Sequence, residues 1–148
     1  MKISTKGRYG LRALVDLASH TRDCAISLVN VAQRQKISLN YLEQVFATLR
    51  KAGIVRSVKG AQGGYMLAKD PAELTVGEII TALEGKFSII DEAHEGGEQK
   101  DYVQQAIQEM VWDRINTSVN TYLDETTLEQ LVEQYEKLNQ DEVMMYYI

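Results

Sequence analysis

The sequence predicts a mainly α-helical fold, in which a winged helix-turn-helix domain with a two-stranded wing is followed by a long dimerisation helix and a C-terminal helix. Three observations predict it. Apolar residues recur at helical spacing over the first 50 residues, two short β-rich segments then flank a glycine-rich turn, and a longer helical pattern fills most of the remaining chain. We place the winged helix-turn-helix domain at residues 1–85 and a helical region for dimerisation and regulation at residues 86–148.

The first three helices follow from their caps and apolar stripes. Ser4 and Thr5 are good helix-starting residues, and apolar side chains at helical spacing after them predict a helix over about residues 5–20. Ser27 is placed to cap a short second helix, and Ser38 a third. Two helices joined by such a short turn are typical of the helix-turn-helix motif.

The third helix has a polar face opposite its apolar stripe. Asn40, Glu43 and Gln44 lie on this polar face together with Tyr41, and most of these side chains can hydrogen-bond to the edges of DNA bases. A plain solvated helix surface would have a similar composition. The segments around this face favour the DNA-binding interpretation.

A hairpin is predicted directly after the third helix. Residues 54–59 and 65–69 are rich in β-formers and are separated by the turn GAQGG. A nucleotide-binding loop is the alternative, but the glycine spacing fits neither G-x-x-x-x-G-K-[ST] nor G-x-G-x-x-G, and a strand-like segment follows instead of a helix. We therefore interpret the hairpin as a wing whose glycines allow close approach to DNA, with Arg56 and Lys59 near phosphate or a narrow minor groove.

Charge divides the chain. Residues 1–70 carry twelve Lys and Arg and four acids, a net +8, whereas residues 71–148 carry four and seventeen, a net −13. A basic front half is typical of a protein that meets a polyanion, although charged runs also occur on ordinary solvated faces. A protein-interaction module that kept the winged fold and lost DNA binding is a further alternative. A steep loss of DNA affinity with salt would separate the two.

The second half continues as helices. Thr75 and Glu78 have capping-box spacing and predict a helix that ends at Gly85. Thr126 and Thr127 precede the last helix, whose apolar tail VMMYYI is expected to pack on a partner subunit. The long helix between them has an apolar stripe that a two-fold related copy would cover. The predicted dimerisation residues are Tyr102, Val103, Ile107, Met110, Val111, Ile115, Val119 and Tyr122.

Other classes of protein are disfavoured. No window approaches the length of a membrane span and the start lacks the apolar stretch of a secretory signal, so we expect a soluble cytoplasmic protein without a membrane partner. An enzyme is not expected, because His20 and His94 are the only histidines and no catalytic motif surrounds either.

The motifs STKGRYG, YLEQ, LRKAG and the GGY wing turn, in this order and spacing, resemble the Rrf-two family of bacterial winged-helix transcription regulators. The resemblance covers about residues 1–85 and, more loosely, the rest. It implies a homodimer that binds a near-palindromic double-stranded DNA operator, with Glu43 as a specificity residue and Lys59 at the wing tip in the minor groove. The predicted DNA-binding residues are Ser4, Lys6, Arg8, Ser27, Ser38, Asn40, Tyr41, Glu43, Gln44, Arg50, Arg56, Lys59, Gly60, Gln62, Gly63 and Gly64.

The resemblance also bears on cofactors and partners. Cluster-binding members carry three cysteines before the dimerisation helix, but residues 87–102 contain none and only His94 there could ligate a metal, so we expect neither an iron–sulfur cluster nor a metal site. This departure favours the branch that represses cysteine and sulfur metabolism genes, in which cysteine synthase (O-acetylserine thiol-lyase) is a co-repressor. We expect that enzyme to bind, through the C-terminal tail. A redox- or metal-responsive regulator with another regulon stays open.

Cys24 is the single cysteine and the candidate redox sensor. Arg22 beside it would favour the thiolate and Asp23 would oppose it. A free cysteine is, however, among the most buried residue types, so the sequence favours a small core side chain over a redox switch.

Overall fold

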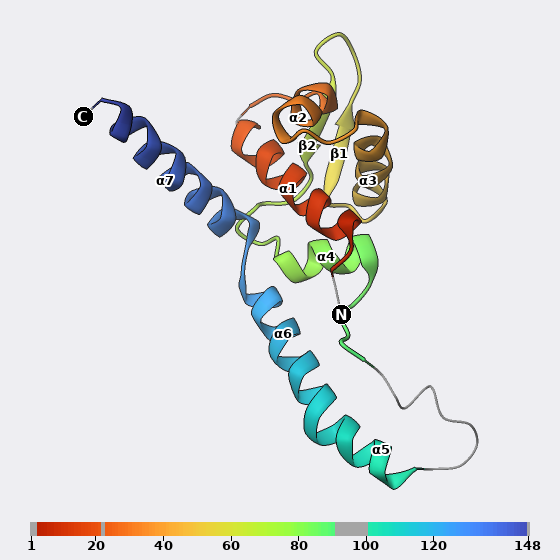
Figure 1. Cartoon of the computed structure of the whole chain (residues 1–148). Coiled ribbons are helices and arrows are strands. Elements are labelled where there is room, and N and C mark those ends of the chain that lie inside the picture. Colours follow the sequence, from red (N-terminus) through yellow and green to blue (C-terminus); the bar gives the residue numbers. More distant parts are fainter. Residues whose placement is uncertain (1–2, 22, 91–100, 148) are drawn as a thin grey trace.

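A computed structural model describes residues 3–21, 23–90 and 101–147. The first part of the chain forms a body of four helices and one antiparallel hairpin (Figure 1). The hairpin register pairs Val55 with Leu67 and Val58 with Gly64. The body elements are α1 (Thr5–His20), α2 (Leu28–Gln35), α3 (Leu39–Lys51), β1 (Val55–Val58), β2 (Gly64–Leu67) and α4 (Val76–Glu84). The predicted winged helix-turn-helix architecture is thereby confirmed.

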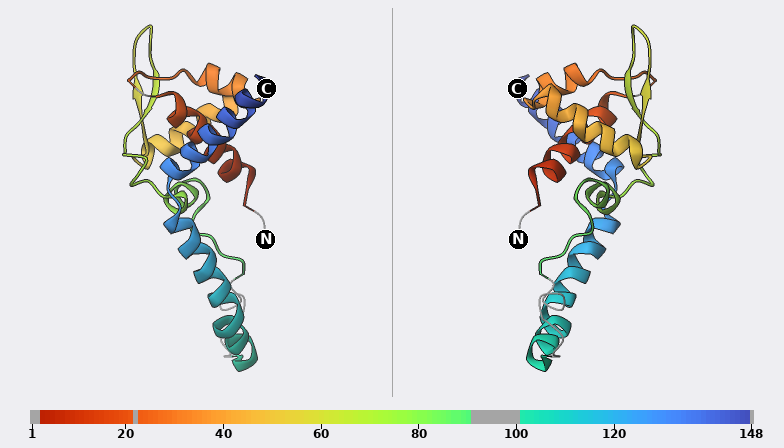
Figure 2. Two further views of the ribbon diagram at one scale, coloured as in Figure 1. Left: turned by 90° about the vertical axis from the view of Figure 1, so that its left-hand side faces the viewer. Right: turned by 90° about the vertical axis from the view of Figure 1, so that its right-hand side faces the viewer.

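The second part forms an arm. Helix α5 (Tyr102–Ile107), a π-helical turn η2 (Gln108–Trp112) and α6 (Asp113–Glu125) run on as one long helix that points away from the body, and α7 (Leu128–Tyr146) follows (Figures 1 and 2). The long helix and the last helix were both predicted. The π-helical turn was not, and the last helix continues through most of the apolar tail VMMYYI.

Side-chain caps fix where the helices begin. The hydroxyls of Ser4, Ser27 and Ser38 accept hydrogen bonds from backbone amides of the first turns of α1, α2 and α3, and Thr75 and Thr127 do so for α4 and α7. Such caps stabilise a helix by about 1 kcal/mol each. All five were predicted from the sequence.

The capping box predicted at α4 is wrong in one half. The Glu78 amide donates to the Thr75 hydroxyl over 3.0 Å, but the Glu78 carboxylate forms an ion pair with Lys69 instead of returning to the Thr75 amide. The cation was available because the chain that follows β2 passes beside the start of α4. A complete capping box forms at α7, between Thr127 and Gln130.

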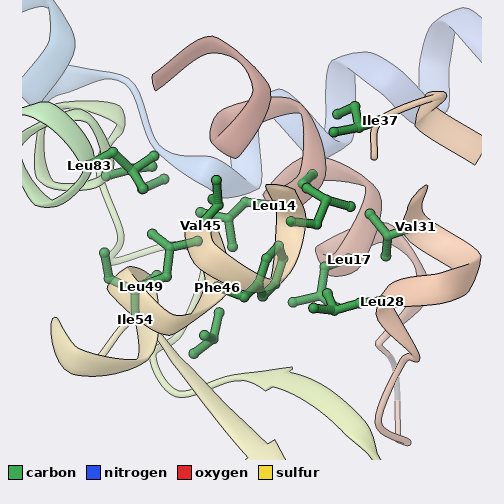
Figure 3. Close-up of a cluster of buried hydrophobic side chains, with 14 of the residues drawn as sticks. Leu14, Leu17, Leu28, Val31, Ile37, Val45, Phe46, Leu49, Ile54 and Leu83 are labelled. Atoms are coloured by element: carbon green, nitrogen blue, oxygen red, sulfur yellow. The ribbon is translucent and has the colours of Figure 1, made fainter. Parts of the chain in front are cut away.

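The apolar core lies between α1, α2, α3, β1 and α4 (Figure 3). Phe46 of α3 is fully buried at its centre, and Ile37, in the turn before α3, is buried with Leu42 as a hydrophobic staple predicts. Leu128 of α7 is also fully buried in this core. Because each such side chain contributes about 1.5–3 kcal/mol, the body has a stabilising core of its own and α7 is anchored to it.

One partly buried ion pair joins α1 to α2. Asp16 is 5% exposed and accepts three hydrogen bonds of 2.6–3.1 Å from the Arg34 guanidinium and one of 2.8 Å from the side-chain amide of Gln35. The hydrogen bond to Asp16 raises the pKa of Arg34. The pair therefore fixes the end of α2 against α1.

Body and arm meet at a joint between the starts of α4 and α7. The Val76 amide donates to the Thr126 carbonyl and the Leu128 amide to the Leu74 carbonyl, each over 2.8 Å. A side chain at Gly77 would overlap the carboxylate of Asp124, so α6 passes in close contact with α4 here. We call these two hydrogen bonds and this contact the joint.

Within the described ranges, no helix is long and apolar enough to cross a membrane.

Candidate nucleic-acid interface

The turn between α2 and α3 sets the geometry of the helix-turn-helix unit. Lys36 ends α2 in the left-handed region, with φ of 55°, and Ser38 already caps α3 two residues later. A left-handed residue at this place reverses the chain within a single short turn. Helix α3 therefore lies across α2 with one face against the core and the other free.

The free face of α3 carries the predicted base-reading side chains. Asn40, Glu43 and Gln44 are exposed, whereas Tyr41 is half-buried and its ring meets the ring of Tyr9 on α1 edge to face, with centroids 6.2 Å apart. Amide and carboxylate groups on one exposed helix face can hydrogen-bond to base edges in a major groove.

The wing is anchored beside this face. Ile26, between α1 and α2, exchanges two backbone hydrogen bonds of 2.9 Å with Tyr65 of β2. The Tyr65 ring packs against Phe46 of α3, with centroids 5.1 Å apart. The wing loop extends beyond the ends of α2 and α3 (Figure 1). These contacts with the core therefore fix the base of the wing next to the free face of α3.

The wing glycines have two different roles. A Cβ atom at Gly63 would overlap the carbonyl oxygen of Val58, and one at Gly64 would overlap that of Ile26. Both glycines are therefore required by the packing of the protein itself. Gly60, with φ of 117° and open space around it, is the wing glycine whose backbone is free to approach DNA.

Three predicted cations are available for phosphate. Arg50, Arg56 and Lys59 are exposed, and none of them pairs with a carboxylate in the part of the chain that the structure describes. One arm of Arg56 lies 3.3 Å from the sulfur of Met66 across the hairpin. Gln62 is exposed at the wing tip with Lys59 and Gly60.

Several predicted residues come together in one cleft of about 410 Å³, where the start of α2, the free face of α3 and the base of the wing meet. Ser27, Glu43 and Gly64 line it. So does Val29, an apolar side chain that is 45% exposed and that the sequence analysis did not select. The available signal was its position outside the apolar stripe of α2, because such a side chain can contact a thymine methyl group.

The N-terminal candidates lie elsewhere. The hydroxyl and amide of Ser4 are both hydrogen-bonded to the Glu84 carboxylate, and Lys6 is half-buried. Arg8 lies near the Tyr9 ring and lines a different cleft, against α7. The structure does not bring Arg8 into the cleft that Glu43 lines.

The predicted dimerisation residues form an apolar stripe along the arm. All are exposed except Val119, which is half-buried, and the exposed fraction reaches 75% at Tyr102. The last turns of α7 are also apolar and exposed, from Val143 to Tyr147. The body is therefore too small to cover this apolar surface, as the length of the stripe in the sequence predicted.

The interpretation of Cys24 as a core residue is wrong. Cys24 is exposed in the connection between α1 and α2. Ile26 holds this connection to the wing and packs against the core, whereas Cys24 points to the surface two residues before it. Arg22 and His94 lie outside the described residues.

Comparisons with known proteins agree with this geometry. The Rrf2 (Rrf-two) family model, described as iron-dependent transcriptional regulator, matches residues 3–134. Over the whole length of both chains, 39% of residues are identical to the HTH-type transcriptional regulator CymR of Bacillus subtilis. The solved structure of CymR, the global cysteine regulator of B. subtilis, covers 90% of this chain and 98% of its own at a TM-score of 0.77 and 40% identity.

Two further solved structures are similar. The IscR protein of T. potens is 40% identical, with a TM-score of 0.75, over 93% of this chain and 90% of its own. The oxidised form of Staphylococcus aureus CymR is 41% identical, with a TM-score of 0.71, over 90% of this chain and 97% of its own.

Proposed function

Because the chain belongs to the Rrf2 family, whose members here are helix-turn-helix transcription regulators and not enzymes, it is a DNA-binding regulator, and we propose that it acts as a dimeric repressor on a near-palindromic operator. Each protomer would insert α3 into a major groove and place its wing on the flanking minor groove. Two-fold symmetry of the protein would then match two-fold symmetry of the operator.

The single observation that carries this proposal is the common surface of α3 and the wing. Polar side chains of α3 and the cations Arg50, Arg56 and Lys59 are exposed on rigidly connected elements, and these cations have no carboxylate partner among the described residues. Cations position a protein on phosphate and polar side chains read base edges, so the two kinds of contact have separable effects.

In vitro selection from random duplexes tests the proposal. We expect enrichment of a near-palindrome with half-sites about one or more helical turns apart. Both variants are then measured on the selected operator and on its single-base variants. Lys59→Ala should weaken binding to all of these sequences about equally and lower the slope of log affinity against log salt concentration by about one. Gln44→Ala should cost about 1–3 kcal/mol at one base pair and change the base preference there. Equal effects of both variants on every sequence would contradict the assignment, and failure to enrich any sequence would support the interaction-module alternative.

The apolar stripe of the arm supports the dimer. A soluble monomer rarely exposes a contiguous apolar patch of this extent, and an antiparallel copy would cover the stripe from Tyr102 to Tyr122. The oligomeric state is measured by analytical ultracentrifugation. A monomer at operator-saturating concentrations would refute the dimer.

The regulated genes are proposed from CymR, the global cysteine regulator of B. subtilis, to which this chain is similar over its whole length. A cluster held by thiolates does not fit, because Cys24 is the single cysteine of the sequence. We infer instead that cysteine synthase is a co-repressor and docks on the exposed tail from Val143 to Tyr147. A pull-down from native cell extract, with and without O-acetylserine, that never contains cysteine synthase would refute this.

A second candidate signal is oxidation of Cys24. Its exposure makes the thiol accessible to peroxide, and one relative has been solved in an oxidised form. The expected result is that peroxide changes the operator affinity of the parent and not of Cys24→Ser. If both proteins respond alike, the switch is refuted.

A further inference from the structure

A second cleft of about 350 Å³ lies between α1 and α7, on a different part of the body from the cleft that Glu43 lines. Helix α7 runs from the joint past α1 and is in contact with it (Figures 1 and 2). We call it the α1–α7 cleft. The lining residues that matter for what it can bind are Arg8, Arg12, Val15, Gln35, Leu131 and Tyr135.

Two arginines make part of the lining of the α1–α7 cleft cationic. Arg12 donates to the backbone carbonyl of Gln35 over 2.8 Å, and Arg8 donates to the Thr5 hydroxyl over 3.4 Å and lies over the ring of Tyr9. Within residues 3–21, 23–90 and 101–147, neither guanidinium has a carboxylate partner.

The single acid of the α1–α7 cleft does not neutralise these two cations. Asp16 also lines the cleft, but its oxygens are occupied by Arg34 and Gln35. The Asp16–Arg34 pair is neutral as a unit. The cleft therefore presents two uncompensated positive charges.

The rest of the lining of the α1–α7 cleft is mainly apolar. Val15 of α1 and Leu131 of α7 are half-buried there, and the ring of Tyr135 closes one side with a 43% exposed side chain. A cleft of this volume takes a small organic molecule, and a few charged groups on an apolar lining are typical of small-molecule sites. A guanidinium fork matches the geometry of a carboxylate.

We propose that the α1–α7 cleft binds a small organic carboxylate with an apolar body, the carboxylate against Arg8 and Arg12 and the body between Val15, Leu131 and Tyr135. This site is separate from the cleft that Glu43 lines and from the exposed tail of α7.

Tyr9 connects the two arginines of the α1–α7 cleft to the recognition helix α3. The Tyr9 ring lies under Arg12, 5.2 Å from its guanidinium carbon, and under Arg8 at 6.0 Å, and it supports Tyr41 of α3. A carboxylate that engages both guanidinium groups competes with these cation–π contacts. The bound ligand therefore changes operator affinity, a consequence that rests on the proposed function, whereas the site itself does not.

Fluorine NMR of the full chain tests the site without DNA. The probe is 4-fluorophenylacetate, and the comparison is its uncharged analogue 2-(4-fluorophenyl)ethanol. We expect the acid to bind at least about tenfold more tightly than the alcohol, because only the acid meets the two guanidinium groups. Arg12→Gln should weaken binding of the acid at least about tenfold, and Tyr135→Ala should weaken both probes. Arg114→Gln on α6 is the matched control and should leave both affinities unchanged.

Three results would overturn the site. The first is equal binding of acid and alcohol. The second is acid binding that Arg12→Gln does not alter while Met145→Ser abolishes it, which would place the acid on the exposed tail of α7. The third is binding that occurs only to the dissociated monomer, which would show that a second copy of the chain fills the cleft in the dimer. Circular dichroism verifies the fold of each variant, and the acid-to-alcohol ratio of the parent needs no variant. On the selected operator, a saturating concentration of the acid should change the dissociation constant at least about threefold, and an unchanged constant would overturn the coupling alone.

Discussion

The body and the arm are made from similar amphipathic helices but treat their apolar residues in opposite ways. In the body, Leu14, Leu42, Phe46 and Leu49 are fully buried within one chain. In the arm, side chains of the same type, such as Met110 and Ile115, remain exposed along α5, η2 and α6. The body is thus complete as a single copy, whereas the arm has the composition of an interface without its second half.

The difference shows that stability and assembly are separate properties of this chain. Burial in the body stabilises the fold, while the exposed stripe contributes free energy only when a partner covers it. Substitutions can therefore be chosen that affect one property and leave the other unchanged.

The largest effect is expected in the body. Phe46→Ala removes a fully buried ring and should lower the free energy of unfolding by about 3–5 kcal/mol. Tyr146→Ala removes an aromatic ring that is 85% exposed on the arm and should change it by no more than about 0.5 kcal/mol. Urea unfolding at fixed protein concentration measures both, and equal losses would abolish the distinction between body and arm.

The next effect concerns assembly. Ile115→Asp places a charge in the stripe and should raise the dimer dissociation constant at least about 100-fold, which is about 2.7 kcal/mol. Thr117→Asp, on an exposed polar position of the same helix, is the matched control. Sedimentation measures the dissociation constant. If Ile115→Asp still forms the parent dimer, the stripe is not the interface.

A smaller effect compares the polar contacts of the two regions. Asp16→Asn breaks the partly buried pair with Arg34 and should cost about 2–3 kcal/mol of unfolding free energy. In the arm, Asn116 of α6 accepts from the Ile89 amide over 2.7 Å, and Asn116→Ala should cost about 1 kcal/mol. Thermal or urea unfolding measures both, and an Asn116→Ala cost above that of Asp16→Asn would reverse the order.

A smaller effect on stability than that of Asp16→Asn is expected in the wing. Gly64→Ala would force the carbonyl of Ile26 to move and open its hydrogen bonds with Tyr65, at about 1–2 kcal/mol. Operator affinity should fall more than stability does, because the wing loses its anchor. Lys59→Ala, which leaves that anchor intact, serves as the comparison. Unchanged affinity in Gly64→Ala would show that the wing does not need this anchor.

Much of the body could be predicted from local sequence. Ser4, Ser27 and Ser38 cap their helices as expected, and the glycine-rich turn forms the hairpin between Val58 and Gly64, because caps and turns depend on residues within a few positions of each other. The polar face of α3 could be predicted equally well, because it follows from helical periodicity alone.

Most of the features that were missed depend on contacts between distant segments. The pair of Asp16 with Arg34, the diversion of Glu78 to Lys69 and the joint at Thr126 each bring together residues that no periodicity relates. The π-helical turn has no local sequence signal, and the exposure of Cys24 follows from the tertiary path of its connection. The DNA contacts and the dimer stay predictions.

The joint also makes the long helix a lever. Its 24 residues from Tyr102 to Glu125 span about 36 Å at 1.5 Å per residue, and its base is held at the two backbone hydrogen bonds next to Thr126. A rotation of about 5° at that base moves the far end by about 3 Å, the length of one hydrogen bond. In a symmetric dimer joined through these two long helices, a small rotation at each base would change the separation of the two wings. That separation sets the number of base pairs between the two half-sites that the dimer can bind.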